Sequence, residues 1–165
     1  MDERPIIKIV PTAADRWVEI LGWLALLTMW IFTIKSYSTL PDIIPVHYNV
    51  AGQPDGYGQK ITILTLPGIA LVLFVGLTVL NRFPHIFNYP TEITPENALR
   101  QYTHATRLIR YIKLGLVMLF CFILFHILQT ANGADQSMNP WVLPVGIGFI
   151  FVVVAYFVVK AYREK

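Results

Sequence analysis

The side chains best suited to recognition chemistry gather in one short polar segment of this 165-residue sequence, residues 38–60. The segment holds an imidazole, an amide, a carboxylate and two phenol rings, all of which form hydrogen bonds. No nucleophile motif accompanies them, so we predict a binding function rather than a catalytic one and assign no catalytic residue. The predicted ligand-binding residues are His47, Tyr48, Asn49, Asp55 and Tyr57.

The same segment is rich in signals for local structure. Val46, Tyr48 and Val50 alternate with polar residues, which is typical of a short strand. Residues 51–58 then read as consecutive turns, because their Pro, Asp and Gly residues favour turn conformations. We therefore expect residues 38–60 to form a structured outer cap over the ends of neighbouring helices.

A metal site is a weaker interpretation of the same residues. His47 and His126 are the candidate ligands, and Asp42, Asp55 and Asp135 are expected on the same side of the molecule. Their spacing matches no compact metal motif. The alternative is that the acids stabilise turns and the histidines form hydrogen bonds within the cap. Whether a metal binds stays open, and no cofactor is predicted.

A second polar group lies in residues 95–113, which form an amphipathic segment leading into an apolar run. The segment either projects into the cytoplasm or lies at the membrane interface and bends near Gly115. Basic side chains on such a segment favour anionic lipid headgroups, although an ordinary solvated face is the alternative. The predicted contacts to lipid or to a partner protein are Arg100, Arg107, Arg110 and Lys113.

One carboxylate, Glu19, stands near the start of the first apolar run. Arg16 is three residues earlier and lies on the same face of a helix, so we expect a local ion pair. The alternative is an intramembrane carboxylate that relays protons.

Four long apolar runs must position these groups. Hydrophobic residues make up 55% of the sequence and charged residues only 14%, against about 25% in soluble domains. A backbone in lipid satisfies its own hydrogen bonds, so runs of this length predict transmembrane helices. We predict an all-α integral membrane protein with a single domain, 1–165, and helices at about 17–37, 61–80, 108–130 and 141–162.

The distribution of positive charge predicts the orientation. Eleven of the 13 Lys and Arg residues lie in the two terminal segments or around the loop between the second and third runs. Positive residues mark the cytoplasmic side, so we expect a multi-pass protein of the cell membrane with both termini cytoplasmic. The net charge of +3 is not concentrated into a nucleic-acid-binding surface, and we predict no nucleic-acid partner.

Two stretches of the sequence carry a recognisable pattern of residues. They are Leu40-Pro41-x-x-Ile44-Pro45-x-His47-Tyr48-Asn49-x-x-Gly52-x-Pro54-Asp55-Gly56-Tyr57-Gly58-x-Lys60 and, more loosely, residues 87–102. This pattern resembles the domain of unknown function 1648 family, which is also found at the N-terminus of SdpI-type bacterial immunity proteins. The resemblance implies a bacterial cytoplasmic-membrane protein and, for the SdpI-type branch, resistance to a secreted peptide toxin with sequestration of a repressor. It supplies no catalytic residues.

Together these features predict a membrane binding or sensing protein whose first loop recognises an extracytoplasmic peptide, lipid or envelope partner. Two alternatives stay open. One is a metal-dependent membrane enzyme, and the other is an accessory subunit of a transporter.

Overall fold

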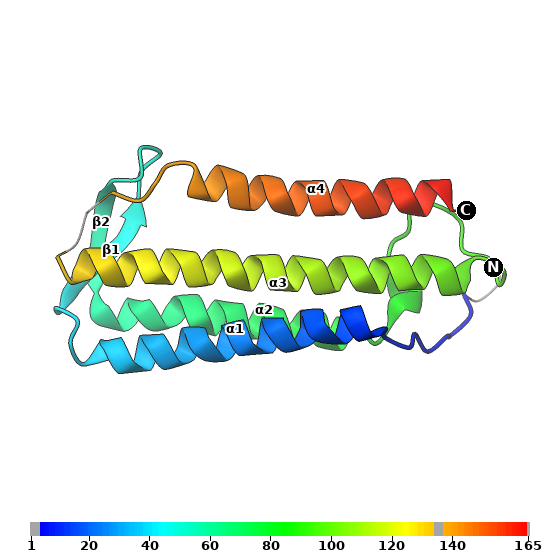
Figure 1. Cartoon of the computed structure of the whole chain (residues 1–165), viewed down its shortest axis with the longest axis horizontal. Coiled ribbons are helices and arrows are strands. Elements are labelled where there is room, and N and C mark those ends of the chain that lie inside the picture. Colours follow the sequence, from blue (N-terminus) through cyan, green and yellow to red (C-terminus); the bar gives the residue numbers. More distant parts are fainter. Residues whose placement is uncertain (1–3, 134–136, 165) are drawn as a thin grey trace.

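Four long helices and one β-hairpin make up the computed structural model, which describes residues 4–133 and 137–164. The helices run along the long axis, the hairpin lies at one end, and both termini lie at the other (Figure 1). We call these the hairpin end and the terminal end. In chain order the elements are α1 (Ala13–Tyr37), β1 (Ile43–Tyr48), β2 (Pro54–Gln59), the 3-10 turn η1 (Lys60–Leu64), α2 (Thr65–Leu80), the 3-10 turn η2 (Pro84–Ile86), α3 (Ala98–Ala131) and α4 (Val142–Arg163).

The prediction of four helices is confirmed, and each is long and apolar enough to cross a membrane, counting η1 with α2. The start of α1 also follows its sequence signal. Thr12 accepts a hydrogen bond from the backbone of Asp15, and the Asp15 carboxylate accepts one from the backbone of Thr12. This reciprocal capping box fixes the first turn.

The prediction of an all-α chain was wrong for the cap, where β1 and β2 pair as an antiparallel hairpin. The consecutive turns expected over residues 51–58 shrink to a turn between Asn49 and Gln53, and Pro54–Gln59 forms a strand instead. Pairing with β1 supplies backbone hydrogen bonds that the local signals of Pro and Gly do not reveal. Gly52 takes a positive φ of 76° in this turn.

The third helix is longer than predicted. The amphipathic segment 95–113 and the span 108–130 join into one continuous helix of 34 residues, about 51 Å long at 1.5 Å per residue. It runs through Gly115 without interruption and without a sharp bend (Figure 1), so its first part extends along the bundle instead of turning aside. The helix begins at Ala98, three residues after the start of the predicted amphipathic segment at residue 95.

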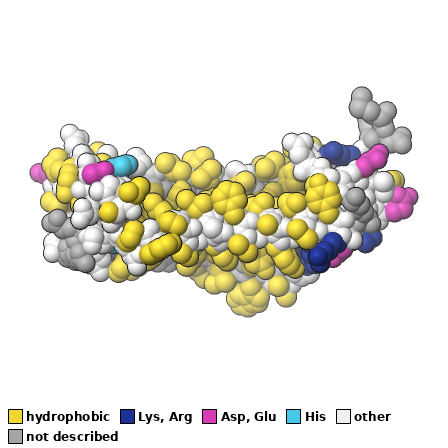
Figure 2. Space-filling view, turned by 90° about the horizontal axis from the view of Figure 1, so that it is seen from above, with side chains coloured by type: hydrophobic (Ala, Val, Ile, Leu, Met, Phe, Trp, Pro, Cys, Tyr) yellow, Lys and Arg dark blue, Asp and Glu magenta, His cyan; other side chains and the backbone are white. Residues whose placement is uncertain are grey.

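α3 is the centre of the bundle, because it packs against α1, α2 and α4. The core between the first three helices is apolar and includes Leu26, Met29, Phe74, Val117 and Leu124. The outer surface is apolar as well, with yellow side chains covering the middle and charged groups at the ends (Figure 2). An apolar exterior of this kind is compatible with contact to a lipid bilayer.

Candidate functional site

The strands of the hairpin bring two predicted binding residues together. His47 on β1 faces Asp55 on β2, and its Nδ1 forms a hydrogen bond with the carboxylate Oδ1. Both side chains are accessible, at 71% and 44%. Gly56 pairs with His47 across the hairpin, and a Cβ there would lie 2.8 Å from the Cβ of His47. A glycine at this position is therefore needed for the imidazole to take its place.

The hydrogen bond to Asp55 sets what the imidazole can do. With Nδ1 facing a carboxylate, the other ring nitrogen, Nε2, is left for a ligand. In the neutral ring Nε2 accepts a hydrogen bond, and in the protonated ring it donates one. The neighbouring carboxylate thus orients the ring.

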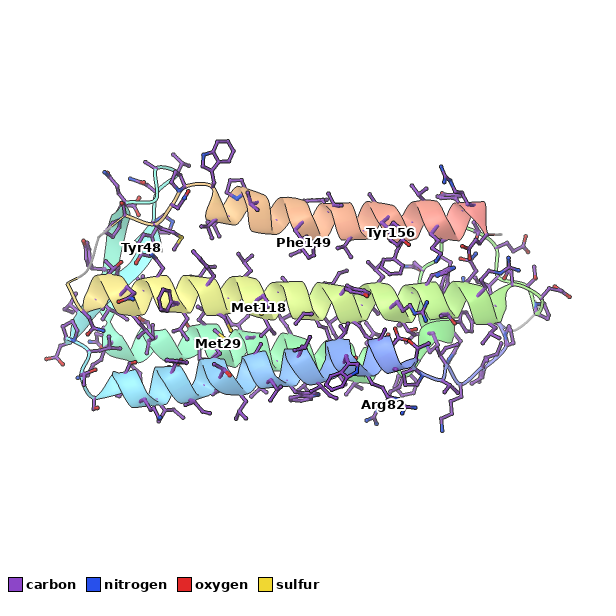
Figure 3. All side chains as sticks on the ribbon, in the orientation of Figure 1. Met29, Tyr48, Arg82, Met118, Phe149 and Tyr156 are labelled. Atoms are coloured by element: carbon purple, nitrogen blue, oxygen red, sulfur yellow. The ribbon has the colours of Figure 1, made fainter. Side chains whose placement is uncertain are left out.

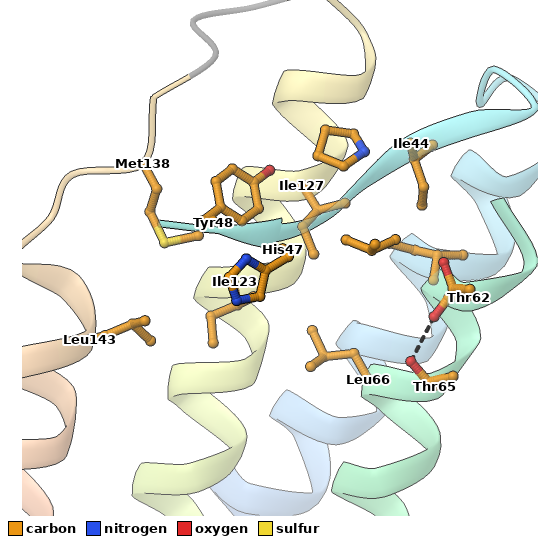
Figure 4. Close-up of a pocket in the computed structure, with 13 residues that line it drawn as sticks. Ile44, His47, Tyr48, Thr62, Thr65, Leu66, Ile123, Ile127, Met138 and Leu143 are labelled. Carbon is orange, nitrogen blue, oxygen red and sulfur yellow. Dashed lines mark hydrogen bonds between the residues drawn. The ribbon is translucent and has the colours of Figure 1, made fainter. Parts of the chain in front are cut away.

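A cavity of about 300 Å³ lies beside His47, between the hairpin and the ends of three helices. Figure 4 shows His47 and Tyr48 reaching from β1 among Ile123 and Ile127 of α3, with Leu143 of α4 on one side and Leu66 of α2 on the other. We call this cavity the hairpin pocket. Its volume lies at the lower end of the range for small-molecule sites.

The pocket wall is largely apolar, and its two threonine hydroxyls are already engaged. The Thr62 hydroxyl donates to the carbonyl of Gln59 at 2.7 Å, and the Thr65 hydroxyl donates to the carbonyl of Thr62 at 2.7 Å (Figure 4). The His47 imidazole is therefore the polar group best placed to meet a ligand. The arrangement can hold an apolar group while hydrogen-bonding a polar one at the rim.

The other predicted binding residues have different places. Tyr48 lines the pocket with its ring 5.5 Å from that of His126. Burial raises the pKa of its phenol, and the nearby Thr130 side chain opposes that shift. Asn49 accepts from the backbone of Ala51 and Gln53, at 2.9 and 3.1 Å, so it stabilises the turn. Tyr57 is exposed and does not line the pocket.

Sequence reasoning missed the residues that form the pocket wall. Ile123, Ile127 and Leu143 belong to apolar runs in which every residue carries the same signal, and only the packing of α3 and α4 under the hairpin singles them out. Met138 belongs to the loop before α4, and its backbone N–H donates to the carbonyl of Gly52 at 2.6 Å. That bond ties the hairpin turn to the chain that enters α4.

The structure gives the metal hypothesis no donor cluster in residues 4–133 and 137–164. Within those residues no three His, Cys, Asp or Glu side chains come close enough to hold an ion. The two histidine candidates are separated in role, since His47 faces Asp55 and His126 packs against Tyr48. Asp135 lies outside the described residues.

The basic residues of α3 form a second constellation, at the terminal end, which we call the charge network. Lys113 Nζ lies 2.8 and 3.0 Å from the two carboxylate oxygens of Glu19 and 2.7 Å from the hydroxyl of Thr78. It also sits 4.5 Å from the centre of the Phe74 ring, and its side chain is 1% exposed. Arg110 pairs with Glu19 at 3.3 Å. Lys113 thus links α3 to α1 and α2 from within the bundle.

Two expectations change as a result. Glu19 pairs with cations of α3, not with Arg16 on its own helix as the local spacing indicated. Among the four cations assigned to lipid or partner contact, Arg100 is exposed, whereas Arg110 and Lys113 are turned inward. Arg107 is 30% exposed and donates from Nε to Asp15 Oδ1 at 3.0 Å. Contacts between residues more than 90 positions apart have no local signature.

Comparison with known proteins finds a family model that matches the region of the hairpin. Residues 24–71 match the model of a domain of unknown function, DUF1648. An uncharacterized protein from Archaeoglobus fulgidus is 31% identical over 78 residues, which cover 42% of this chain and 43% of that protein. The chain thus spans less than half the length of this relative. No solved structure matches the chain. The expected resemblance is confirmed: the region from the middle of α1 through the hairpin to the first turns of α2 matches the DUF1648 model.

Proposed function

We propose that this protein crosses the cell membrane four times and binds an extracytoplasmic ligand in the hairpin pocket. The four apolar helices support insertion, and the positive residues near the terminal end support a cytoplasmic location for both termini. The hairpin then faces away from the cytoplasm.

The observation that carries the proposal is the accessible His47–Asp55 pair beside an apolar cavity. An accessible pair contributes little to the stability of the fold, because solvent weakens the attraction between its members. Stability alone therefore does not explain why these two residues face each other. The neighbouring wall of Ile, Leu and Met side chains provides an apolar surface that a ligand of the pair can contact.

The pocket suits an amphipathic ligand. An apolar side chain of a peptide, or the first part of an acyl chain, fits a cavity of about 300 Å³, and an adjacent hydrogen-bonding group meets Nε2 of His47. The peptide, the lipid and the envelope partner expected from the sequence all offer this chemistry. Resistance to a secreted peptide, which the SdpI-type resemblance implies, is one use of such a pocket.

The orientation is tested by cysteine labelling of intact cells in a Cys121→Ser background. Val50 in the hairpin turn is 98% exposed and Arg163 is exposed at the end of α4. A membrane-impermeant maleimide should label Val50→Cys in intact cells and label Arg163→Cys only after permeabilisation. The reverse pattern would contradict the proposed orientation.

The pocket is tested by photocrosslinking in cells. A diazirine side chain replacing Ile123 points into the pocket, and the same side chain replacing Val145 on exposed α4 is the matched control. We expect a discrete adduct at position 123 that disappears in His47→Ala and is absent at position 145. The same lipid adducts at both positions, unaffected by His47→Ala, would overturn the binding proposal.

A second function, as an accessory subunit of a transporter, is favoured by the position of α4. Its main helix contacts are with α3, and most of its side chains are exposed. Crosslinking through exposed positions of α4, followed by purification in mild detergent, should then capture one constant membrane-protein partner. A subunit role is contradicted if α4 crosslinks only to lipid.

A further inference from the structure

A second cavity, of about 500 Å³, lies at the terminal end between the start of α1 and the facing sides of α3 and α4. Its volume falls within the range of ligand sites. Most of its wall is apolar or aromatic, and one end is polar. The apolar wall consists of Tyr111, Phe149, Val152, Val153, Tyr156 and Phe157, and we call this cavity the terminal groove.

The groove has the length of one leaflet of a bilayer. Phe149, Val153, Tyr156 and Lys160 are separated by three or four residues, so they lie along one side of α4. The 11 steps along the helix from Phe149 to Lys160 rise about 16 Å, and half of a hydrocarbon core is about 15 Å. Phe149 and Tyr156 are labelled along this length in Figure 3. Both are more than half exposed, so the groove opens sideways to the surroundings.

The polar end of the groove has spare positive charge. Asp15 accepts from the backbone and hydroxyl of Thr12, at 2.8 and 2.7 Å, and from Nε of Arg107 at 3.0 Å. Within the described part of the chain, the Nη groups of Arg107 have no hydrogen-bonded protein acceptor. Lys160 approaches Glu164 only to 3.8 Å. Two cations thus line an end whose single carboxylate is already engaged.

We infer that the terminal groove holds an anionic phospholipid of the cytoplasmic leaflet. Its phosphate meets Arg107 and Lys160, and one acyl chain lies along Phe149, Val153 and Tyr156. Arg107 presents its remaining N–H groups to phosphate oxygens, and Lys160 adds a point charge. The inference rests on the membrane insertion proposed above but not on the hairpin pocket, which lies at the other end of the molecule.

Native mass spectrometry of the full chain in a mild non-ionic detergent tests the inference. We expect one molecule of phosphatidylglycerol to bind more tightly than phosphatidylcholine. The double variant Arg107→Gln, Lys160→Gln should weaken that binding by about tenfold or more, since each cation near a lipid headgroup contributes about 1 kcal/mol. The matched variant Arg100→Gln, Arg163→Gln removes two exposed cations from the same end and should leave it unchanged.

A second pair of variants tests the acyl chain. Val153→Phe fills the groove and should weaken phosphatidylglycerol binding, whereas Val159→Phe, outside the groove, should not. The soluble headgroup glycerophosphoglycerol should not compete, because it lacks the chain; competition at equal concentration would assign the site to a free phosphate ester and overturn the lipid assignment.

The lipid assignment would also be overturned if phosphatidylglycerol and phosphatidylcholine bound equally, or if both double variants lost the same affinity for phosphatidylglycerol. If loss of Arg107 prevents folding, Lys160→Gln alone should still weaken binding by about fivefold. Cysteine labelling at Val50 and Arg163 reports insertion separately, so failure of the lipid site and failure of the membrane topology are distinguishable.

Discussion

Each end of this molecule contains paired polar side chains, which are accessible to solvent at the hairpin end and buried at the terminal end. At the hairpin end, His47 and Asp55 meet on an accessible hairpin beside an apolar cavity. At the terminal end, Glu19 is shared by Arg110 and Lys113, whose side chains are 10% and 1% exposed. Burial decides the role of each pair: a buried ion left without its partner destabilises the fold, whereas an exposed pair contributes little stability and remains accessible to a ligand.

The family match follows the same division. The DUF1648 segment, residues 24–71, contains the hairpin and the His47–Asp55 pair. Glu19, Arg110 and Lys113 fall outside it. The comparison between the ends therefore predicts that changes at the terminal end act on stability and that changes at the hairpin end act on binding.

Removing Glu19 should have the largest effect on stability. Glu19→Ala leaves two inward-facing cations of α3 without their carboxylate, and we expect the free energy of unfolding to fall by about 3–5 kcal/mol. Thermal or denaturant unfolding in detergent measures this change. The control Asp42→Ala breaks an exposed pair with Lys60 and should cost less than about 1 kcal/mol. Equal losses of unfolding free energy in Glu19→Ala and Asp42→Ala would show that burial does not determine how much a pair contributes to stability.

Substitution of Gly52 should have the next largest effect. Gly52→Ala places a Cβ 1.7 Å from the carbonyl oxygen of Met138 at a position with φ of 76°, so the turn must move away from the chain entering α4. We expect a loss of about 1–3 kcal/mol and faster proteolysis of the hairpin.

The matched control is Gly68→Ala, because a Cβ at that helical position meets no atom within 4 Å. Ala favours helices over Gly, so this variant should gain up to about 1 kcal/mol. Wild-type stability and proteolysis for Gly52→Ala would refute the link between the hairpin turn and α4.

A smaller, pH-dependent effect is expected where α4 meets α3. A hydrogen bond from His104 Nε2, 2.7 Å away, holds the pKa of Glu164 below its usual value of 4.5. Because the folded state favours the ionised form, this pair stabilises the protein above pH 4.5, and the contribution is lost as the pH falls through the lowered pKa. Melting temperatures of wild type and Glu164→Gln should converge with acidification.

The control for this titration is Glu92→Gln, which removes an exposed carboxylate near the same end. It should keep the acid-side melting curve of the wild type. A difference in melting temperature between wild type and Glu164→Gln that stays constant at every pH would contradict a stabilising role of the ionised carboxylate.

The smallest effect on stability is expected at the pair proposed for binding. His47→Ala and Asp55→Asn should each change the free energy of unfolding by less than about 1 kcal/mol, because both side chains are accessible. The photocrosslinked adduct at position 123 should nevertheless be lost in both. Strong destabilisation by either variant would assign the pair to the fold instead of to a ligand.

The four helices could be predicted from hydropathy, because each helix contains its own apolar run. The cap was readable as structured but not as a hairpin, since Pro54, Gly56 and Gly58 are turn-forming residues locally and become a strand only beside β1. α3 is longer than predicted because its polar first half and its apolar second half carry different sequence signals within one continuous helix. Three basic residues of its first half, Arg107, Arg110 and Lys113, pair with acids of α1.

The candidate site was predictable only in part. His47 and Asp55 carry distinctive chemistry and were identified from type and proximity. The apolar pocket wall and the partners of Lys113 depend on which helix faces which, and no residue pattern in a uniformly apolar run specifies that. Asn49 shows the opposite error, since a residue with binding chemistry stabilises its own turn.

The separation of Glu19 and Lys113 along the chain affects how the protein is synthesised. The two residues are 94 positions apart, so a ribosome makes α1 and α2 well before the cation that neutralises Glu19. Until α3 emerges, the nascent chain holds an acid without these cations near the start of its first helix. Completion of α3 therefore supplies the cations that pair with Glu19, and a chain truncated after α2 is expected to be degraded faster than the full chain.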